Sequence, residues 1–391
     1  MLACVFLLTS CTATSSPDPS SSSDADTGAD VCPSGTAAQD GLCLSGDAVS
    51  EELAGILRSQ FEAEKLTAVI AGVWHDGKPV MVGALGESMS GVPATPDMHH
   101  MLGNLLTPMF TTVVLQQVEA DVLSLDDPVS KWYPDLPSAD AITVEMLLHN
   151  TSGYTQYTAL DDFLEQLYAD PFRHWEIDEI IQIGTQGGTV YTPGSDWMFS
   201  DTNTAVLAGI VEKATGKEVS ELLQTGVFDP LGMDDTTAAL DADWPQPVLH
   251  GFSKERGVWE DVTDWNPSWA LYAGGAGSNQ EDVAAFLDAL GSGELLSDEY
   301  HEIQLAPTTV GIGTNTPEQY WAMGALMLEG WAFLNPGIPG YYGAGGTLPD
   351  EGWTMVVYTT PSPATDPSDA TATGIFRQFT SIVSPEHSLE D

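Results

Sequence analysis

The sequence predicts an α+β fold, in which helices pack on antiparallel strands. Two observations indicate this class. Apolar residues recur at helical spacing between Glu51 and Glu64, and two strand-like runs then meet at an Asp-Gly turn. Helical and strand-like patterns return further along the 391-residue chain, and 42% of its residues are hydrophobic. Such a chain is long enough to bury a large core in one domain or two lobes.

The first elements follow directly from these patterns. Residues 68–74 and 79–85 are strand-like and flank Asp76-Gly77, a pair that is typical of a tight β-hairpin turn. The helix before them, Glu51–Glu64, has one apolar face: Leu53, Ile56, Leu57 and Phe61.

A buried helix is predicted to begin near Asn104 and to lead into a loop that ends at Asp126 and Asp127. Pro108 falls in its first turn, where a missing N–H costs little. Thr143 has the side chain of an N-cap for a short helix. The apolar face of the buried helix is supplied by four residues: Val113, Val114, Leu115 and Val118.

The second half of the chain continues the mixed pattern. Residues 155–185 are predicted to form a helical lobe, and a helix is predicted from Thr204 to Thr215, closed by Gly216. Residues 281–290 have the spacing of an amphipathic helix, and strand-like runs occur between Trp321 and Tyr358.

The charge of the chain excludes one class of partner. Asp and Glu number 57 against 10 Lys and Arg, which gives a net charge of −47. Such a field repels phosphate backbones and anionic lipid surfaces, so we expect no nucleic-acid binding. The charge itself is interpreted as a strongly hydrated surface, as in a salty habitat, and not as an acidic functional patch.

The four cysteines lie in the first 43 residues. Leu8-Thr9-Ser10-Cys11 ends a short apolar run and resembles a bacterial lipobox, in which Cys11 would be lipidated; the alternative is a chance apolar N-terminus. Residues 1–11 are then a lipoprotein signal segment, 12–48 a Ser/Asp/Gly-rich tether in which Cys32 and Cys43 form a disulfide, and 49–385 the folded domain. We expect export across the inner membrane of a bacterium, to a location that is either lipid-anchored at the cell envelope or extracellular, with the lipid as the only attachment to a membrane.

Five further segments and the helix near Asn104 resemble, in order and spacing, the serine β-lactamase, penicillin-binding protein and esterase superfamily, in its class C-like branch. The resemblance covers about residues 50–380. It implies an antiparallel sheet flanked by helices, with an inserted all-helical lobe and a cleft between them. The five segments are LDDPV at 125–129, LLHNTSG at 147–153, residues 191–201, FDPLGM at 228–233, and residues 342–347.

The resemblance also locates the reactive groups of the family, and most of them are replaced. Its nucleophilic Ser falls on Asn104, its Lys on Thr107 and its Tyr on Phe199. Asp201 stands for an Asn, while Ala344 and Gly346 stand for the His or Lys and the Gly of the third motif. Acyl transfer to serine needs a hydroxyl nucleophile and a base, and Asn104 and Thr107 provide neither. None of the six lysines completes a Ser-x-x-Lys motif.

The backbone groups that bind a ligand in the family are expected to remain, because they do not depend on side-chain identity. The backbone N–H groups of Asn104 and Thr347 would form the oxyanion hole that the resemblance implies. Ser152 and Ser200 border the expected cleft, and His149 lies three residues before Ser152, but we interpret these as turn and packing residues. His99-His100 lacks partners at a metal-binding spacing, so no metal is expected. The aromatic residues around the expected cleft either pack in the core or form a surface on which a sugar or peptide could stack. The cleft candidates are Ser152, Ser200, Tyr154, Trp197 and Tyr342.

The resemblance therefore predicts a serine hydrolase scaffold without cofactor that has lost catalysis. It would bind a peptidoglycan-derived peptide, a glycan or a protein partner. The alternative is an active β-lactamase, D,D-carboxypeptidase or esterase that uses displaced residues, and a purely structural envelope lipoprotein is a third class.

Overall fold

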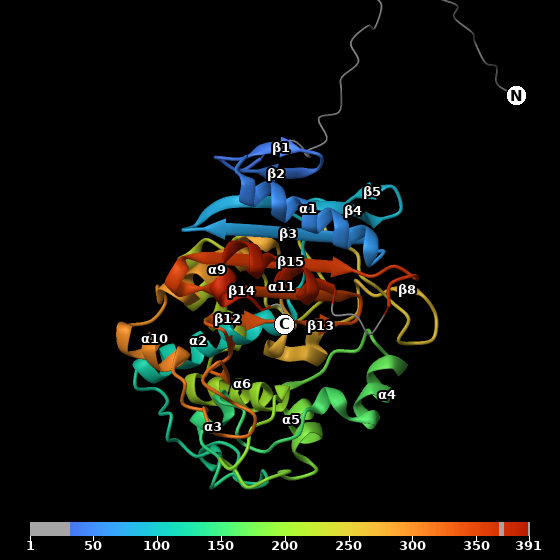
Figure 1. Cartoon of the computed structure of the whole chain (residues 1–391). Helices are drawn as coiled ribbons and strands as arrows, with labels where there is room; N and C mark the ends of the chain where they lie inside the picture. The colour runs from blue at the N-terminus through green and yellow to red at the C-terminus, as the bar shows by residue number, and fades with distance from the viewer. Residues whose placement is uncertain (1–31, 367–370, 390–391) are drawn as a thin grey trace, which may run out of the picture. The chain divides into compact units, whose positions relative to one another are not determined.

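A sheet of eleven strands organises the structure, a computed structural model that describes residues 32–366 and 371–389. Its strands pair in the order β1-β2-β4-β3-β15-β14-β12-β11-β10, with β5 beside β4 and β13 beside β14, and every pairing is antiparallel (Figure 1). The strands are β1 (Ala37–Gln39), β2 (Leu42–Leu44), β3 (Ala68–His75), β4 (Lys78–Met89), β5 (Val92–Pro93), β10 (Gln319–Trp321), β11 (Leu326–Leu328), β12 (Trp331–Leu334), β13 (Gly337–Ile338), β14 (Tyr341–Leu348) and β15 (Trp353–Thr360).

The predicted hairpin is confirmed as β3 and β4. Asp76 and Gly77 both have positive φ angles, of 50° and 69°, which is the backbone of the two-residue turn that matches the twist of paired strands. Two small ribbons lie outside the large sheet, and both are antiparallel. They pair β6 (His100–Met101) with β9 (Gly277–Ser278), and β7 (Phe252–Ser253) with β8 (Glu260–Asp261).

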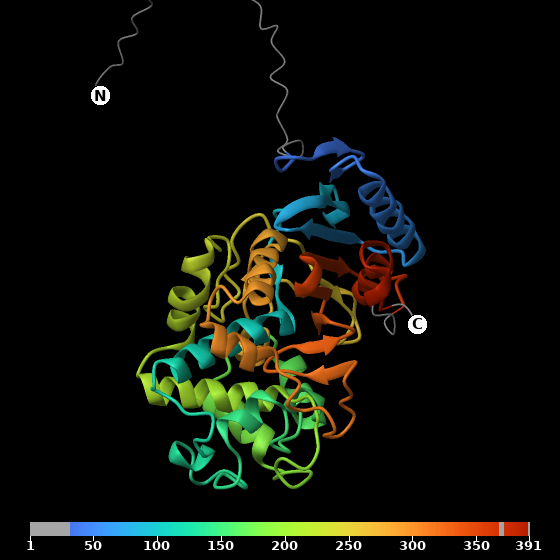
Figure 2. The same ribbon diagram turned by 60° about the vertical axis from the view of Figure 1, so that its left-hand side comes forward.

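Helices cover both faces of the sheet, as Figure 2 shows. α1 (Ala48–Ala63) and α11 (Thr371–Val383) pack together on one face, where Val357 of β15 joins their apolar core. α9 (Gln280–Ser292) covers the other face, and α2 (Leu106–Glu119) lies in the core on that side. Successive residues of a strand point to opposite faces, which keeps the two cores separate.

A helical lobe lies on the α2 side of the sheet (green in Figure 1). Thr143 accepts a hydrogen bond from Met146 N–H at 3.2 Å and caps α3, and Gly216 ends α6 with a φ of 71°, as the sequence predicts. The remaining helices are α3 (Val144–Leu148), α4 (Asp161–Ala169), α5 (Ile177–Thr185), α6 (Asp201–Thr215), α7 (Val219–Leu223), α8 (Asp229–Leu231) and α10 (Asp298–Leu305).

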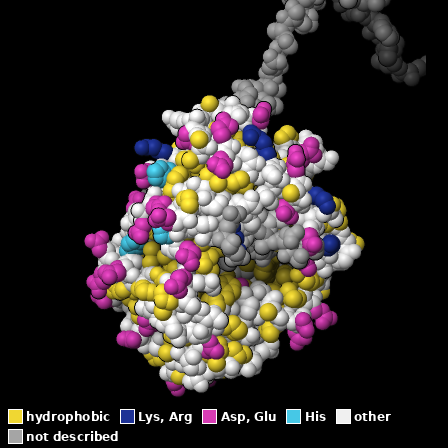
Figure 3. Space-filling model, in the orientation of Figure 1, with side chains coloured by type: hydrophobic (Ala, Val, Ile, Leu, Met, Phe, Trp, Pro, Cys, Tyr) yellow, Lys and Arg dark blue, Asp and Glu magenta, His cyan; other side chains and the backbone are white. Residues whose placement is uncertain are grey.

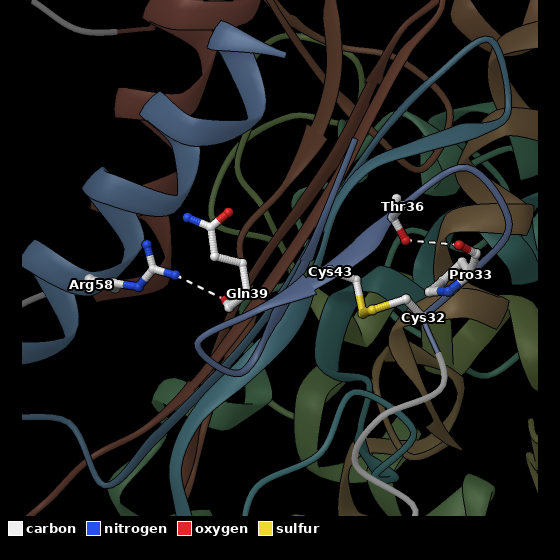
Figure 4. Close-up of a disulfide and its surroundings, with 6 residues drawn as sticks. All are labelled: Cys32, Pro33, Thr36, Gln39, Cys43 and Arg58. Carbon is white, nitrogen blue, oxygen red and sulfur yellow. Dashed lines mark hydrogen bonds between the residues drawn. A yellow bond between two sulfur atoms is a disulfide. The ribbon is translucent and has the colours of Figure 1, made fainter. Parts of the chain in front are cut away.

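The N-terminal boundary differs from the prediction. A disulfide joins Cys32 to Cys43, and Arg58 of α1 donates a hydrogen bond to the carbonyl of Gln39 in the β1–β2 hairpin (Figure 4). β2 pairs with β4, so residues 42–44, which lie before Val49, belong to the large sheet. The lipobox at Cys11 and the tether up to residue 31 lie outside the described residues. None of the described helices is long and apolar enough to cross a membrane.

Candidate functional site

A cavity of about 660 Å³ opens between the sheet and the helical lobe. Its walls come from the start of the α2 region, from α4, from the loop before α6, from the β7–β8 ribbon and from the corner that contains β13. Figure 3 shows a hollow edged by hydrophobic side chains on this face, near the position of β13 in Figure 1. Its lining includes seven aromatic residues: Phe163, Tyr168, Phe199, Phe252, Trp259, Trp269 and Tyr342.

Asn104 lies in this cavity, in the short 3-10 turn that precedes α2. Close backbone contacts place it there, because Gly103 N–H donates to the Gly274 carbonyl at 3.1 Å and Leu102 N–H donates to the Ala276 carbonyl at 2.8 Å. The side-chain Oδ1 of Asn104 is buried and has no hydrogen-bond partner in the described structure. A buried acceptor without a donor is unfavourable, and it is Asn104 as a whole, a half-buried residue, that lines the cavity.

Thr107 is one helical turn further on and does not line the cavity. Its hydroxyl is buried without a partner in the described chain, and it lies on α2 among apolar neighbours. The position that resembles the catalytic lysine of the family thus holds no amine and is closed off. Lys254, on the β7–β8 ribbon, is the one lysine among the residues that line the described cavity.

Phe199 and Asp201 both line the cavity, as the resemblance implies. Phe199 packs edge-on against Trp321, with ring centroids 5.4 Å apart. Asp201 begins α6 and is tied to Gln156 twice: Gln156 Nε2 donates to Asp201 Oδ2 at 2.7 Å, and Asp201 N–H donates to Gln156 Oε1 at 2.8 Å. Burial raises the pKa of the Asp201 carboxyl from 3.8 to about 6, although the bond from Gln156 opposes this shift.

Asn150 holds the loop that carries these two residues. Its Oδ1 accepts hydrogen bonds from Ser200 N–H at 3.1 Å and from Asn203 Nδ2 at 2.7 Å. Its carbonyl accepts a bond from Met198 N–H at 3.1 Å. A φ of 57° brings both oxygen atoms toward the loop, and asparagine tolerates that backbone conformation better than most residues. Asn150 therefore acts as a positioning residue.

Ala344 does not line the cavity. Ala344 is fully buried and belongs to the core shared with α1 and α11, because it pairs with Val357, which points to the same face. The neighbouring Gly343 and Gly345 face the other side of β14. Pro336 and Ile338 of the β13 corner lie next to Gly103, the residue before Asn104. A Cβ on Gly103 would lie 2.4 Å from Pro336 Cβ and 3.5 Å from Ile338 Cγ2.

Of the two residues expected to form the oxyanion hole, Asn104 lines the cavity and Thr347 does not. Thr347 is in the middle of the sheet, paired with Ala332 on β12 and with Thr354 on β15, and it does not line the cavity. Gly346 shares the Ala344 face, where a Cβ would meet Phe376 of α11 at 3.1 Å. Of the two predicted backbone donors, Asn104 alone reaches the cavity.

Among the five cleft candidates, only Tyr342 lines the cavity. Ser152, Ser200 and Tyr154 are buried and bonded within the lobe, and Trp197 packs near Trp321. His149 shares a hydrogen bond with Thr308 at 2.9 Å and not with Ser152, and burial lowers its pKa to about 4. No group of three or more His, Cys, Asp or Glu side chains that could hold a metal occurs in residues 32–366 and 371–389.

Gln156 and the corner from Pro336 to Gly340 also line the cavity, although no motif in the sequence identifies them as site residues. Gln156 lies 45 residues from Asp201 in the sequence and belongs to no motif, so no local signal could have identified it. The proline and glycine residues of the corner do predict a turn, but they do not indicate that it flanks Asn104.

Replacing Asp201 with asparagine is expected to stabilise the protein at neutral pH. The folded-state pKa of about 6 exceeds the ordinary 3.8, so the folded state binds more protons between these values and stability falls as the pH rises through them. Each pKa unit is worth about 1.4 kcal/mol, and allowing for water in the cavity we expect D201N to gain about 1–2 kcal/mol near pH 7. Urea unfolding near pH 7 and near pH 4 measures this, with the gain lost at the lower pH.

Glu255→Gln is the matched control for D201N, because it removes the same charge from an exposed position on the same cavity. The comparison separates the effect of burying the Asp201 carboxylate from the effect of removing one negative charge from a strongly acidic protein. An equal gain in E255Q, or a D201N gain that persists near pH 4, would contradict the burial of an ionised Asp201.

Comparisons with known proteins agree with this geometry. The family model described as Beta-lactamase matches residues 53–378. Penicillin-binding protein 4* of Bacillus subtilis (strain 168) is 29% identical over 141 residues, which are 34% of this chain and 29% of that protein. Esterase EstB of Burkholderia gladioli is 27% identical over 205 residues, 49% of this chain and 52% of that protein. The chain therefore spans from under a third to about half of the length of these curated relatives.

Solved structures extend the likeness to the whole domain. A D-amino acid amidase from Ochrobactrum anthropi SV3, complexed with L-phenylalanine amide, has a TM-score of 0.74 and 21% identity, covering 88% of this chain and 100% of that one. At this identity the likeness shows the fold, an antiparallel sheet with helices and an inserted helical lobe. Together with the match of the family model over most of the chain, it establishes that this chain belongs to the β-lactamase-related serine hydrolase family.

Proposed function

We propose that this protein is a non-catalytic member of the family, which binds a peptide-derived ligand of the cell wall in the cavity next to Asn104. One observation carries the proposal: a half-buried carboxamide, Asn104, lines the cavity at the position that matches the nucleophile of the family. A carboxamide does not attack an acyl group, but it can donate and accept hydrogen bonds.

The surroundings of Asn104 support the loss of catalysis. Acyl transfer needs a base within hydrogen-bond reach of the nucleophile. Thr107 and Phe199 have no titratable group, and the nearest strand corner contributes Pro336 and Ile338. The names of the relatives, a penicillin-binding protein and an amidase of D-amino acids, favour peptide-like ligands over glycans or a protein partner. Export and anchoring through Cys11 are part of the same proposal and rest on the resemblance of residues 8–11 to a lipobox.

The test is covalent labelling of the purified full chain with a fluorophosphonate probe and with a fluorescent penicillin. We expect neither to label the protein, while an active serine hydrolase of the family, run in parallel, is labelled by the fluorophosphonate. The physical reason is that the positions matching the nucleophile and the base of the family hold Asn104 and Thr107.

Labelling would favour the alternative, an active hydrolase with a displaced nucleophile. Ser253 is the residue to replace first, because it lines the cavity beside Lys254. Ser362 lines the same cavity and provides the matched control. A label that disappears in Ser253→Ala and remains in Ser362→Ala would establish catalysis and end the pseudoenzyme proposal.

A further inference from the structure

We infer that the cavity recognises its ligand through an ammonium group, which is held by the Asp201 carboxylate and enclosed by aromatic side chains. This inference rests on the proposed binding function and names the chemistry of the ligand. The argument has three parts: the carboxylate has no cationic partner, the surrounding walls suit a cation, and the charges that line the cavity sum to a negative value.

The Asp201 carboxylate is held in place but not neutralised. Its Oδ2 accepts the bond from Gln156 Nε2, and the backbone bond from Asp201 N–H to Gln156 Oε1 fixes the orientation of both side chains. None of the ion pairs formed within residues 32–366 and 371–389 includes Asp201. A half-buried carboxylate that lacks a counter-ion gains strongly from one, because water screens the pair less than it would on an open surface.

The position of Asp201 keeps the carboxylate available. It begins α6, and negative charge at the N-terminal end of a helix is stabilised by the helix dipole. Burial opposes ionisation, but a pKa of about 6 leaves the group charged at neutral pH. An aspartate that lowers stability at this place is more readily explained by binding than by folding.

The cavity that contains Asp201 also has aromatic residues that suit a cation with an apolar group. Trp269, Phe199, Tyr168 and Phe163 line the same cavity. The faces of such rings attract ammonium groups, and the attraction grows as water is excluded. The apolar surface between them provides space for an aliphatic or aromatic side chain of the ligand.

The other charges of the cavity do not reverse this preference. Lys254 and Glu255 both line it, are exposed, and lie next to each other on the β7–β8 ribbon. Their charges cancel, so ionised Asp201 leaves the lining with a net charge of −1. The net charge of −47 on the whole chain adds a long-range attraction for cations, which the experiment has to separate from the local one.

The test compares two probes of nearly equal size, 2-phenylethylamine and 2-phenylethanol, which differ in the ammonium group. Binding to the full chain is measured by isothermal titration near neutral pH, in about 0.5 M NaCl to screen the general field of the protein. We expect the amine to bind the wild-type protein at least about tenfold more tightly than the alcohol.

Two variants assign the preference to a residue. D201N should reduce the amine-to-alcohol ratio to about twofold or less and leave the affinity for the alcohol unchanged, because the shape of the side chain is preserved. Glu255→Gln removes a charge from the same cavity and should keep the ratio. D201N is expected to be at least as stable as the wild-type protein, so a loss of the preference cannot be attributed to unfolding.

Each other outcome overturns the inference. Equal affinities for the two probes, a ratio that survives in D201N, or no binding of the amine would show that Asp201 does not recognise an ammonium group. These results would leave the proposed function in place, because it depends on the labelling experiment. Covalent labelling would instead remove the proposed function whatever the result of the titration.

Discussion

Replacing Gly103 with alanine is expected to lower the free energy of unfolding by about 3 kcal/mol, the sum of a backbone term and a packing term. Gly103 has a φ of 57°, in the left-handed region that glycine adopts at no steric cost. A Cβ there would lie 2.4 Å from Pro336 Cβ, closer than two carbon atoms without a bond can approach. The backbone strain at residue 103 and the cost of displacing the β13 corner add to give the total loss. Displacing this corner also moves the wall of the cavity next to Asn104.

Gly216→Ala separates the two terms. Gly216 also has a left-handed backbone, with a φ of 71°, but no atom lies within 4 Å of the place where its Cβ would be. We expect it to cost about 1 kcal/mol, the backbone term alone. Urea unfolding of both variants gives the comparison. Equal losses of unfolding free energy in G103A and G216A would show that the β13 corner moves aside at no measurable cost, and that Gly103 has no packing role.

The second large effect is the response to salt. The protein has 57 acidic and 10 basic residues, and two like charges 10 Å apart in water repel each other by about 0.4 kcal/mol. Unfolding separates these charges, so repulsion destabilises the folded state. The screening length falls from about 30 Å at 0.01 M salt to about 3 Å at 1 M salt, and we expect the free energy of unfolding to rise by several kcal/mol over this range.

Urea unfolding in NaCl from about 0.01 to 1 M tests this expectation. Sucrose at matched osmolality is the control, since it carries no charge and stabilises proteins by exclusion from their surface. Loss of stability on adding NaCl, or an equal gain in sucrose, would mean that repulsion between surface carboxylates does not limit the folded state. The ion pairs within the described residues are mostly exposed, so their weakening by salt is a small opposing effect.

The elements that sequence could predict are those whose signals are local. The β3–β4 hairpin, the Thr143 cap and the end of α6 at Gly216 each depend on a few adjacent residues. The β1–β2 hairpin was missed because β1 is exposed along its whole length, so it shows no alternation of apolar and polar residues.

The site was harder to predict, because it depends on distant contacts and on strand register. Ala344 and its neighbours in β14 are glycine and alanine, whose side chains do not reveal which face meets the core. A shift of one residue exchanges the two faces of a strand, so a match to a family motif does not determine that Ala344 belongs to the core shared with α1 and α11. Asn104, Phe199 and Asp201 line the cavity, and their places in the chain are easier to predict because they lie at the starts of helices.

The short disulfide-bonded hairpin at the N-terminus has a consequence for self-association. β2 pairs with β4 and thereby occupies the amide and carbonyl groups along part of that long strand. A chain that lost this hairpin, by proteolysis or by starting at Val49, would present the same groups as an open edge. Exposed strand edges pair with strands from other molecules, so the β1–β2 hairpin protects the whole domain against aggregation.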